Sequence, residues 1–306
     1  MIYIITDRKE QQMNLRDKKF IPYYILASVI ILCAVLVVVI IKFASANRED
    51  TTPEIIIVTE PEETTRFLFG EVPYYPDSPA SAYLQENFVL EDGRISYLDD
   101  MVSFSTGVDV SAFQGDIDWD AVAADGIDFA IIRAGLRGYG SKGSIHEDDN
   151  VRKNLVGAAD AGLRVGVYFY SQAITVEEAI EEAEFVLDII KDYQIDAPVV
   201  FDWENEPGLG MRTDNLPGNV LTDCAVAFCE KIKAAGYTPC VYFNLSDAYV
   251  RYDLDKISDY VFWYAQHKGV SPKFYYQYNI WQYSDAGKVD GIDGYVDLNI
   301  CFDSVG

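Results

Sequence analysis

Apolar and polar residues alternate in a regular block pattern from residue 107 to the C-terminus. Short runs rich in Val, Ile, Phe and Tyr are typical of buried strands, and the longer stretches between them have helical periodicity. This pattern predicts strands at 107–111, 128–133, 164–170, 197–203, 238–243, 260–265, 279–283 and 296–300. It predicts helices near 119–125, 149–161, 175–193 and 219–235.

The order of these elements indicates an α/β fold. Helices separate the early strands, whereas shorter or irregular links join the later ones. The sequence therefore predicts a modified (β/α) barrel with eight strands and an incomplete helical ring, and about 200 residues suit one such domain. A doubly wound sheet is the main alternative.

The N-terminal part contains a predicted transmembrane helix. Ile21–Ile41 is 21 residues without a charge, long enough to cross about 30 Å of hydrocarbon as a helix. Five Lys or Arg residues precede it, and only Lys42 and Arg48 follow closely before acidic residues dominate. The positive-inside rule then places the N-terminus in the cytoplasm and the remaining chain outside the cell. The alternative is secretion after cleavage near Ala46, because Ala44-Ser45-Ala46 resembles a signal cleavage site.

Five segments are expected along the chain. Prolines and Thr/Glu repeats mark a stalk after the membrane helix, and Asp92-Gly93 between apolar runs predicts a hairpin in a small leader. The predicted segments are a cytoplasmic tail (1–20), a transmembrane helix (21–43), an extracellular stalk (44–70), the leader (71–106) and the barrel (107–306).

Composition excludes several classes of function. The net charge of −25 disfavours nucleic-acid binding, which needs a basic surface. The only two histidines, His146 and His267, lie far apart in sequence, and no HExxH, Cys/His cluster, P-loop or dinucleotide fingerprint is present. No metal or cofactor is therefore predicted. The five cysteines are expected mainly as buried free thiols, although a bridge through Cys240 or Cys301 is the alternative in an external domain.

Carboxylates at strand ends are the candidate chemistry. The run from Pro198 to Phe201 is apolar and leads into Asp202-Trp203-Glu204. Residues two apart on a strand share a face, so Asp202 and Glu204 are expected on the same side, with Trp203 opposite. Asp109 on the first strand and Asp297 on the last should join them at the C-terminal face of a closed barrel, where barrel active sites lie.

Aromatic and amide side chains near the same strand ends are typical of a carbohydrate site, because aromatic rings stack on sugars and amides bind hydroxyl groups. Arg133 ends the second strand and is expected to pair with Asp109 or Asp202 more readily than with substrate. The aromatic candidates are Tyr168, Tyr170, Tyr242, Trp263, Trp281 and Tyr283, about half of which are expected to be ordinary core residues.

These motifs, in this order, resemble the glycoside hydrolase family 25 lysozymes over residues 107–306. The resemblance implies a peptidoglycan hydrolase that cleaves the β-1,4 bond between N-acetylmuramic acid and N-acetylglucosamine with retention. The matching segments are Gly107–Ser111, Gln114-Gly115, Ile117–Trp119, Ile131–Gly135, Gly166–Tyr170, Phe201–Glu204, Trp281–Ser284 and Val296–Asn299.

The resemblance also implies roles for particular residues. Glu204 is the expected general acid/base, and Asp202, Asp109 and Asp297 complete the acidic cluster; Gln266 and Gln282 join the expected sugar contacts. We expect Glu204 to be the carboxyl with the raised pKa and Asp202 to stay ionised. Gln266-His267 departs from the family pattern, which usually has Tyr after the Gln, so contacts at the rim are expected to differ.

Two other functions remain open at this point. The barrel could be a non-catalytic module that binds cell-wall glycan, or a hydrolase of another N-acetylated glycan. The presence of all four acids favours catalysis over binding alone. The expected partners are peptidoglycan glycan strands and, through residues 21–41, the lipid bilayer.

Overall fold

The computed structural model describes residues 64–67, 70–204 and 210–302. The predicted membrane segment at 21–41 lies outside these residues, as do the tail and most of the stalk. In the described part of the chain, no helix combines the length and the apolar character needed to span a bilayer. The described residues all belong to one compact unit.

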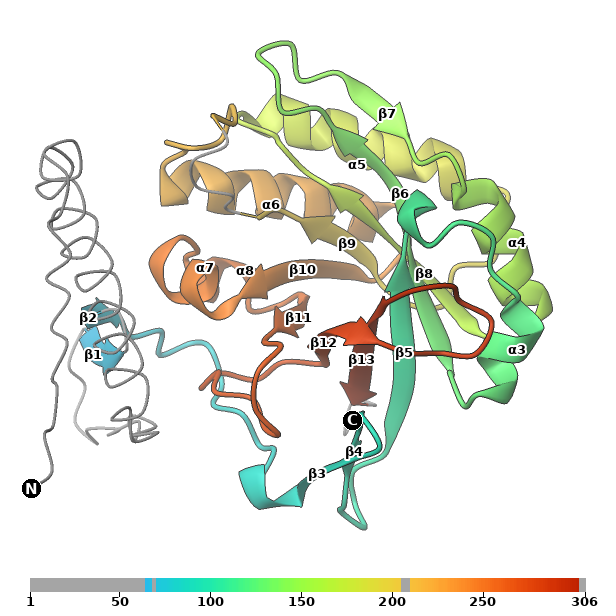
Figure 1. The fold of residues 1–306 in the computed structure, drawn as a ribbon. Helices are drawn as coiled ribbons and strands as arrows, with labels where there is room; N and C mark the ends of the chain where they lie inside the picture. Colours follow the sequence, from blue (N-terminus) through green and yellow to red (C-terminus); the bar gives the residue numbers. More distant parts are fainter. Residues whose placement is uncertain (1–63, 68–69, 205–209, 303–306) are drawn as a thin grey trace, which may run out of the picture. The chain divides into compact units, whose positions relative to one another are not determined.

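A closed barrel of eight strands forms the core of the described residues (Figure 1). The sheet order is β5-β13-β12-β11-β10-β9-β8-β6, and pairing of β5 with β6 closes it. The short strand β7 (Ile145–Glu147) adds to the outer edge of β6. The barrel strands are β5 (Phe104–Val110), β6 (Phe129–Arg137), β8 (Arg164–Tyr170), β9 (Val199–Asp202), β10 (Pro239–Asn244), β11 (Val261–Ala265), β12 (Ile280–Gly287) and β13 (Val296–Phe302). Closure confirms the predicted barrel and excludes the doubly wound sheet.

The last strand runs against its neighbours. β13 is antiparallel to both β12 and β5, whereas the pairs from β5 through β6 to β12 are parallel. Only eight residues separate β12 from β13, too few for a crossover connection, which takes a dozen or more. The start of β13, not its end, therefore lies at the mouth of the barrel.

Helices cover only part of the barrel, as the irregular later links predict. The four predicted helices follow the early strands and lie outside them in Figure 1. Two shorter helices follow β10, and the stretch between β12 and β13 contains none. The helices are α3 (Trp119–Ala124), α4 (Val151–Asp160), α5 (Val176–Ile190), α6 (Gly218–Ala234), α7 (Leu245–Val250) and α8 (Leu254–Ile257). The sequence did not predict the short elements α7, α8 and β7.

Successive side chains along each strand point alternately into and out of the barrel, so the hydrophobic core consists of two clusters. One small cluster fills the barrel interior and includes Ile131, Val200, Trp263 and Ile280. A much larger cluster contains the intervening residues, such as Phe201 and the apolar faces of the helices. Cys224, Cys229 and Cys240 are buried free thiols, as expected.

The leader packs on the barrel through aromatic residues. Tyr83 stacks on Phe302 of β13 with ring centroids 4.0 Å apart, and Phe88 contacts the edge of Trp281. The predicted hairpin forms from β3 (Phe88–Glu91) and β4 (Arg94–Tyr97), and positive φ values of 49° at Asp92 and 79° at Gly93 are those of a type I′ turn. Four further short elements lie outside the barrel sheet: β1 (Thr64–Phe67) paired with β2 (Gly70–Pro73), and the 3₁₀ turns η1 (Gln85–Asn87) and η2 (Ala112–Gln114).

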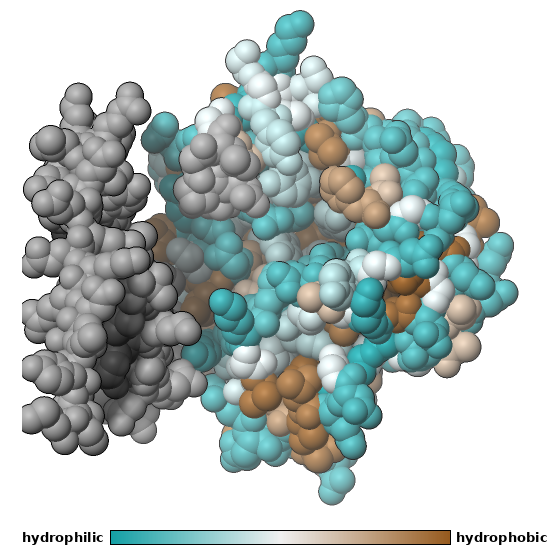
Figure 2. Space-filling model, in the orientation of Figure 1, coloured by the Kyte–Doolittle hydropathy of each residue, from teal (hydrophilic) through white to brown (hydrophobic). Residues whose placement is uncertain are grey.

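Polar residues dominate the face seen in Figure 2, in keeping with the acidic composition. Apolar residues gather at its lower end, around the β3–β4 hairpin. In the leader, Leu90, Leu98 and Met101 are exposed by 49%, 64% and 83%.

Candidate active site

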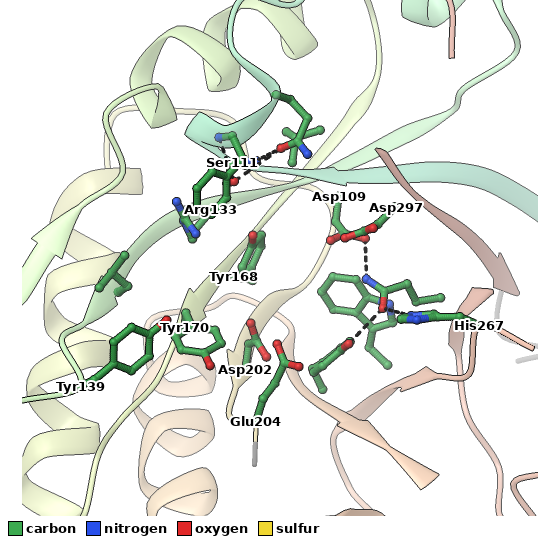
Figure 3. A pocket seen from close by; sticks show the side chains of 17 residues that line it. Asp109, Ser111, Arg133, Tyr139, Tyr168, Tyr170, Asp202, Glu204, His267 and Asp297 are labelled. Carbon is green, nitrogen blue, oxygen red and sulfur yellow. Dashed lines mark hydrogen bonds between the residues drawn. The ribbon is translucent and has the colours of Figure 1, made fainter. Parts of the chain in front are cut away.

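Four carboxyl groups from distant parts of the sequence line one pocket of about 350 Å³ at the mouth of the barrel. Asp109 lies near the end of β5, Asp297 near the start of β13, and Asp202 and Glu204 at and just beyond the end of β9. Asp109 and Asp297 are direct partners in the strand register. Figure 3 shows this pair facing the Asp202 and Glu204 side chains across the pocket. The predicted convergence of the four acids is confirmed.

Asp109 and Asp297 form a hydrogen-bonded pair. The Asp109 carboxyl accepts at Oδ2 from Nε2 of Gln282 (2.9 Å) and from Nδ2 of Asn299 (2.7 Å). Burial raises the pKa of Asp109 despite these two donors. Burial, followed by the nearby charge of Asp109, raises the pKa of Asp297 to about 8. Two close carboxylates cannot easily both ionise, so the pair retains a proton near neutral pH.

Asp202 and Glu204 differ in exposure. Asp202 is 5% exposed and Glu204 is half-buried, while Trp203 between them is fully buried on the opposite side, as the strand alternation predicts. Burial, then the charges of Glu204 and Asp109, raise the pKa of Asp202 well above its ordinary value. This direction is opposite to our expectation that Asp202 stays ionised. The reason is that burial at the end of β9 contributes more to the pKa of Asp202 than repulsion between the acids does.

Gln282 connects the acids to the opposite wall of the pocket. Its Oε1 accepts from the Tyr242 hydroxyl (2.9 Å) and lies 2.9 Å from Nε2 of His267. Trp263 donates from Nε1 to Oδ1 of Asn299 (2.8 Å), which orients the second amide that holds Asp109. These amides and aromatic groups therefore fix the Asp109 carboxyl in one orientation.

Six of the eight predicted sugar contacts line the pocket. They are Tyr168, Tyr170, Arg133, Tyr242, Trp263 and Gln282.

Gln266 and Trp281 are elsewhere. Trp281 is fully buried, because it alternates with Ile280 and Gln282 along β12 and so packs outside the barrel wall, against Phe88 and Tyr283. The Gln266 amide binds the backbone at Lys268, Ser271 and Lys273, so it shapes the following loop. The structure therefore gives both residues structural roles in place of sugar contact.

Arg133 pairs with Asp148, not with Asp109 or Asp202 as predicted. Its Nε and Nη2 lie 2.8 Å from Oδ2 of Asp148, whose side chain is fully buried. The carboxylate also accepts from the backbone N–H of Ala112 (3.0 Å). The ring of Phe113 lies over the guanidinium, 5.1 Å from its carbon.

Several residues of the pocket were not predicted. The missed residues include Phe113, which is 85% exposed, and Tyr139, which is 51% exposed and packs edge-on against Tyr170. Both belong to links that follow a strand, where periodicity gives no signal. The only sequence feature that could have indicated them is an aromatic residue within a few positions of a strand end. The other pocket residues that were not predicted are Val110, Ser111, Gln114, Leu136 and His267.

The raised pKa values predict that stability falls as pH rises. Asp109, Asp202 and Asp297 bind protons more tightly in the folded than in the unfolded state, so the unfolded state gains stability from about pH 4 upward. For Asp297 this loss continues to about pH 8. We expect Tm to be lower at pH 8 than at pH 5 and the slope to be shallower in Asp297→Asn. An unchanged slope in that variant, with exposed Asp160→Asn as control, would contradict the assignment.

The arrangement can hold a ring between paired acids, amides and aromatic groups, and it can deliver a proton. This combination defines a glycosidase-type site at the mouth of a barrel. Among the described residues, no group of three or more His, Cys, Asp or Glu side chains is placed to hold a metal ion.

Comparisons with known proteins agree with this class. The model of Glycosyl hydrolases family 25 matches residues 108–292, so the chain belongs to this family. The autolytic lysozyme of Clostridium acetobutylicum is 28% identical over 193 residues, which cover 63% of this chain and 54% of that protein. Lysozyme M1 of Streptomyces globisporus is 28% identical over 206 residues, covering 63% of this chain and 66% of that protein. The chain thus matches less than two thirds of either relative.

Solved structures are similar to the same region. The bacterial lysozyme from Streptomyces coelicolor matches with a TM-score of 0.53 and 25% identity, covering 64% of this chain and 91% of that one. A family 25 glycosyl hydrolase from Bacillus anthracis matches with a TM-score of 0.55 and 26% identity, covering 68% and 93%.

Proposed function

We propose that this protein is a peptidoglycan hydrolase that cleaves the β-1,4 bond between N-acetylmuramic acid and N-acetylglucosamine. The observation that carries the proposal is the convergence of Asp109, Asp202, Glu204 and Asp297 on one pocket. Membership of family 25 and the lysozymes among its relatives support the substrate class.

Glu204 is the proposed general acid/base. A glycosidic oxygen is a poor leaving group, so a proton must arrive as the bond breaks. Glu204 is more exposed than Asp202 and lines the pocket, which suits the carboxyl that meets the leaving oxygen. The two acids titrate as a pair, and the raised pKa of Asp202 supports retention of one proton between them near neutral pH. Glu204 donates it and then recovers a proton from the attacking water.

Asp202 is proposed to orient the acetamido group of the sugar. Its Oδ1 is buried and accepts no hydrogen bond within the described part of the chain, so an acetamido N–H would give it a partner. The acetamido oxygen attacks the anomeric carbon while the glycosidic oxygen leaves with the proton from Glu204, which Asp202 has passed to it. The acetamido N–H becomes acidic in this step, and the Asp202 carboxylate stabilises the positive charge. A second displacement by water then opens the ring formed with the acetamido group and gives net retention.

Phe113 and Tyr139 are proposed to bind neighbouring sugars of a long glycan strand. The Phe113 ring is supported on one side by Arg133 and is open to solvent on the other. We expect Phe113→Ala to raise KM for polymeric glycan about tenfold, because one stacking surface is lost, while kcat changes little. Leu98→Ala, an exposed apolar residue of the leader, is the matched control. A selective loss of kcat with normal KM would contradict this role.

The proposal can be separated from the two alternatives by one assay. Purified peptidoglycan is incubated with the protein, and new reducing ends are counted over time. A glycan-binding module would sediment with the wall and release none. A hydrolase of another N-acetylated glycan, such as chitin, would release reducing ends from that polymer but not from peptidoglycan.

We also propose that the protein is anchored in the cell membrane, with the barrel outside. The support is the charge-free stretch at residues 21–41 and the excess of Lys and Arg before it. Extraction of the full chain by detergent but not by high salt tests the anchor. If the protein is instead found in the culture medium with an N-terminus near residue 47, the result would support secretion after cleavage near Ala46.

A further inference from the structure

His267 is the residue of the pocket whose type departs from the family resemblance. Its side chain is 34% exposed, and it contacts two groups on β12. Nε2 lies 2.9 Å from Oε1 of Gln282, and Nδ1 lies 3.5 Å from Oδ2 of Asp285. Asp285 is 66% exposed on its side chain. Both ring nitrogens therefore face oxygen atoms, and Nε2 can bind Oε1 of Gln282 only by carrying an N–H that donates.

The Gln282 side chain can take two orientations that differ by exchange of oxygen and nitrogen. In the orientation found here, the amide nitrogen donates to Asp109 while the oxygen accepts from Tyr242. A hydroxyl can donate or accept, so Tyr242 alone does not select between the orientations. A protonated Nε2 on His267 does select, because the reversed amide would bring two donors together and turn its oxygen toward the Asp109 carboxyl.

We propose that His267 is a positioning residue that holds Gln282 in the orientation that donates to Asp109. This inference rests on the proposed function, since Asp109 is one of the acids of that site. Through Gln282, His267 keeps Asp109 beside Asp297, with which it shares a hydrogen bond. The residue thus acts on the acid pair through Gln282.

The charge of His267 has a second, separable effect. When the imidazole is protonated, its positive charge opposes the rise in the pKa of Asp297. The charged groups around the imidazole are Asp285 on β12, Asp297 on β13 and, beyond Gln282, Asp109 on β5. A substitution that keeps a donor but removes the charge separates the positioning effect from the electrostatic one.

Three variants of the full chain test the proposal: His267→Gln, His267→Phe and Gln282→Met. His267→Gln retains a donor, and His267→Phe retains neither donor nor charge. We expect His267→Phe to lower kcat/KM on peptidoglycan about tenfold, the effect of one lost hydrogen bond in a buried network, and His267→Gln to recover most of that loss. In the Gln282→Met background, His267→Phe should cause no further loss, because the partner through which it acts is gone.

A titration without substrate completes the test. Carbon-13 NMR of the aspartate carboxyl groups should show the Asp297 pKa shifted upward in both His267 variants. This result would stand even if the protein hydrolysed no peptidoglycan, so failure of the proposed function is distinguishable from failure of the electrostatic effect. Additive losses in the double variant, or equal losses in His267→Gln and His267→Phe, would overturn the positioning role. An unchanged Asp297 titration would overturn the electrostatic effect.

Discussion

Glu204→Gln should reduce the release of reducing ends from peptidoglycan by about a thousandfold or more, because general acid catalysis alone contributes about 10²–10⁴-fold. The substitution keeps the size of the side chain and removes its proton chemistry. Glu204 is half-buried at the pocket and not in the packed core, so the fold should be retained. The Tm should stay within a few degrees of the wild-type value.

The matched control for this variant is Glu91→Gln, which changes an exposed carboxyl on the leader hairpin. It should leave turnover unaltered. Sedimentation with purified wall should be retained in Glu204→Gln, because the aromatic and amide contacts remain. Near-normal turnover in Glu204→Gln would remove this residue from the mechanism.

Asp202→Asn should separate activity from stability. We expect kcat to fall about 10²–10⁴-fold, because an amide cannot pass a proton to Glu204 or balance positive charge on the acetamido group. KM should change little. Because burial raises the pKa of Asp202, ionisation destabilises the folded state, and the variant should have a higher Tm than the wild type at pH 8.

A lower kcat together with a higher Tm in Asp202→Asn is the result expected for a residue that serves catalysis and lowers the stability of the folded protein. Exposed Asp293→Asn serves as the control and should change neither quantity. A wild-type kcat in Asp202→Asn would exclude the proposed role. A lower Tm at pH 8 would show that Asp202 is instead a structural partner in its ionised form.

The sequence predicted the barrel because each main strand is an apolar run bounded by clear helix or turn signals. Val199–Asp202 and Arg164–Tyr170 are examples in which the apolar pattern alone located the strand. The reversed direction of β13 was not predicted, since alternation is the same in either direction. The predicted acid cluster nevertheless forms, because Asp297 lies at the start of β13 and the reversal brings that end to the mouth.

Side-chain partners were harder to predict than positions. Arg133 was placed correctly beside the pocket, but its partner Asp148 lies in the link after β7, where sequence spacing says nothing about distance. Trp281 and Gln282 differ by one residue and face opposite sides of the barrel wall. The pKa of Asp202 depends mainly on how deeply the carboxyl is buried. The positions of the neighbouring acids in the sequence do not give this burial.

We propose that the four carboxyl groups at the mouth of the barrel cleave the β-1,4 bond between N-acetylmuramic acid and N-acetylglucosamine. Product analysis tests this bond directly: purified peptidoglycan is digested, the products are reduced with borohydride, and the sugar at each new reducing end is identified by mass spectrometry. We expect N-acetylmuramitol in the wild-type digest and its absence with Glu204→Gln. N-acetylglucosaminitol as the main product, or no new reducing ends with the wild-type protein, would contradict it.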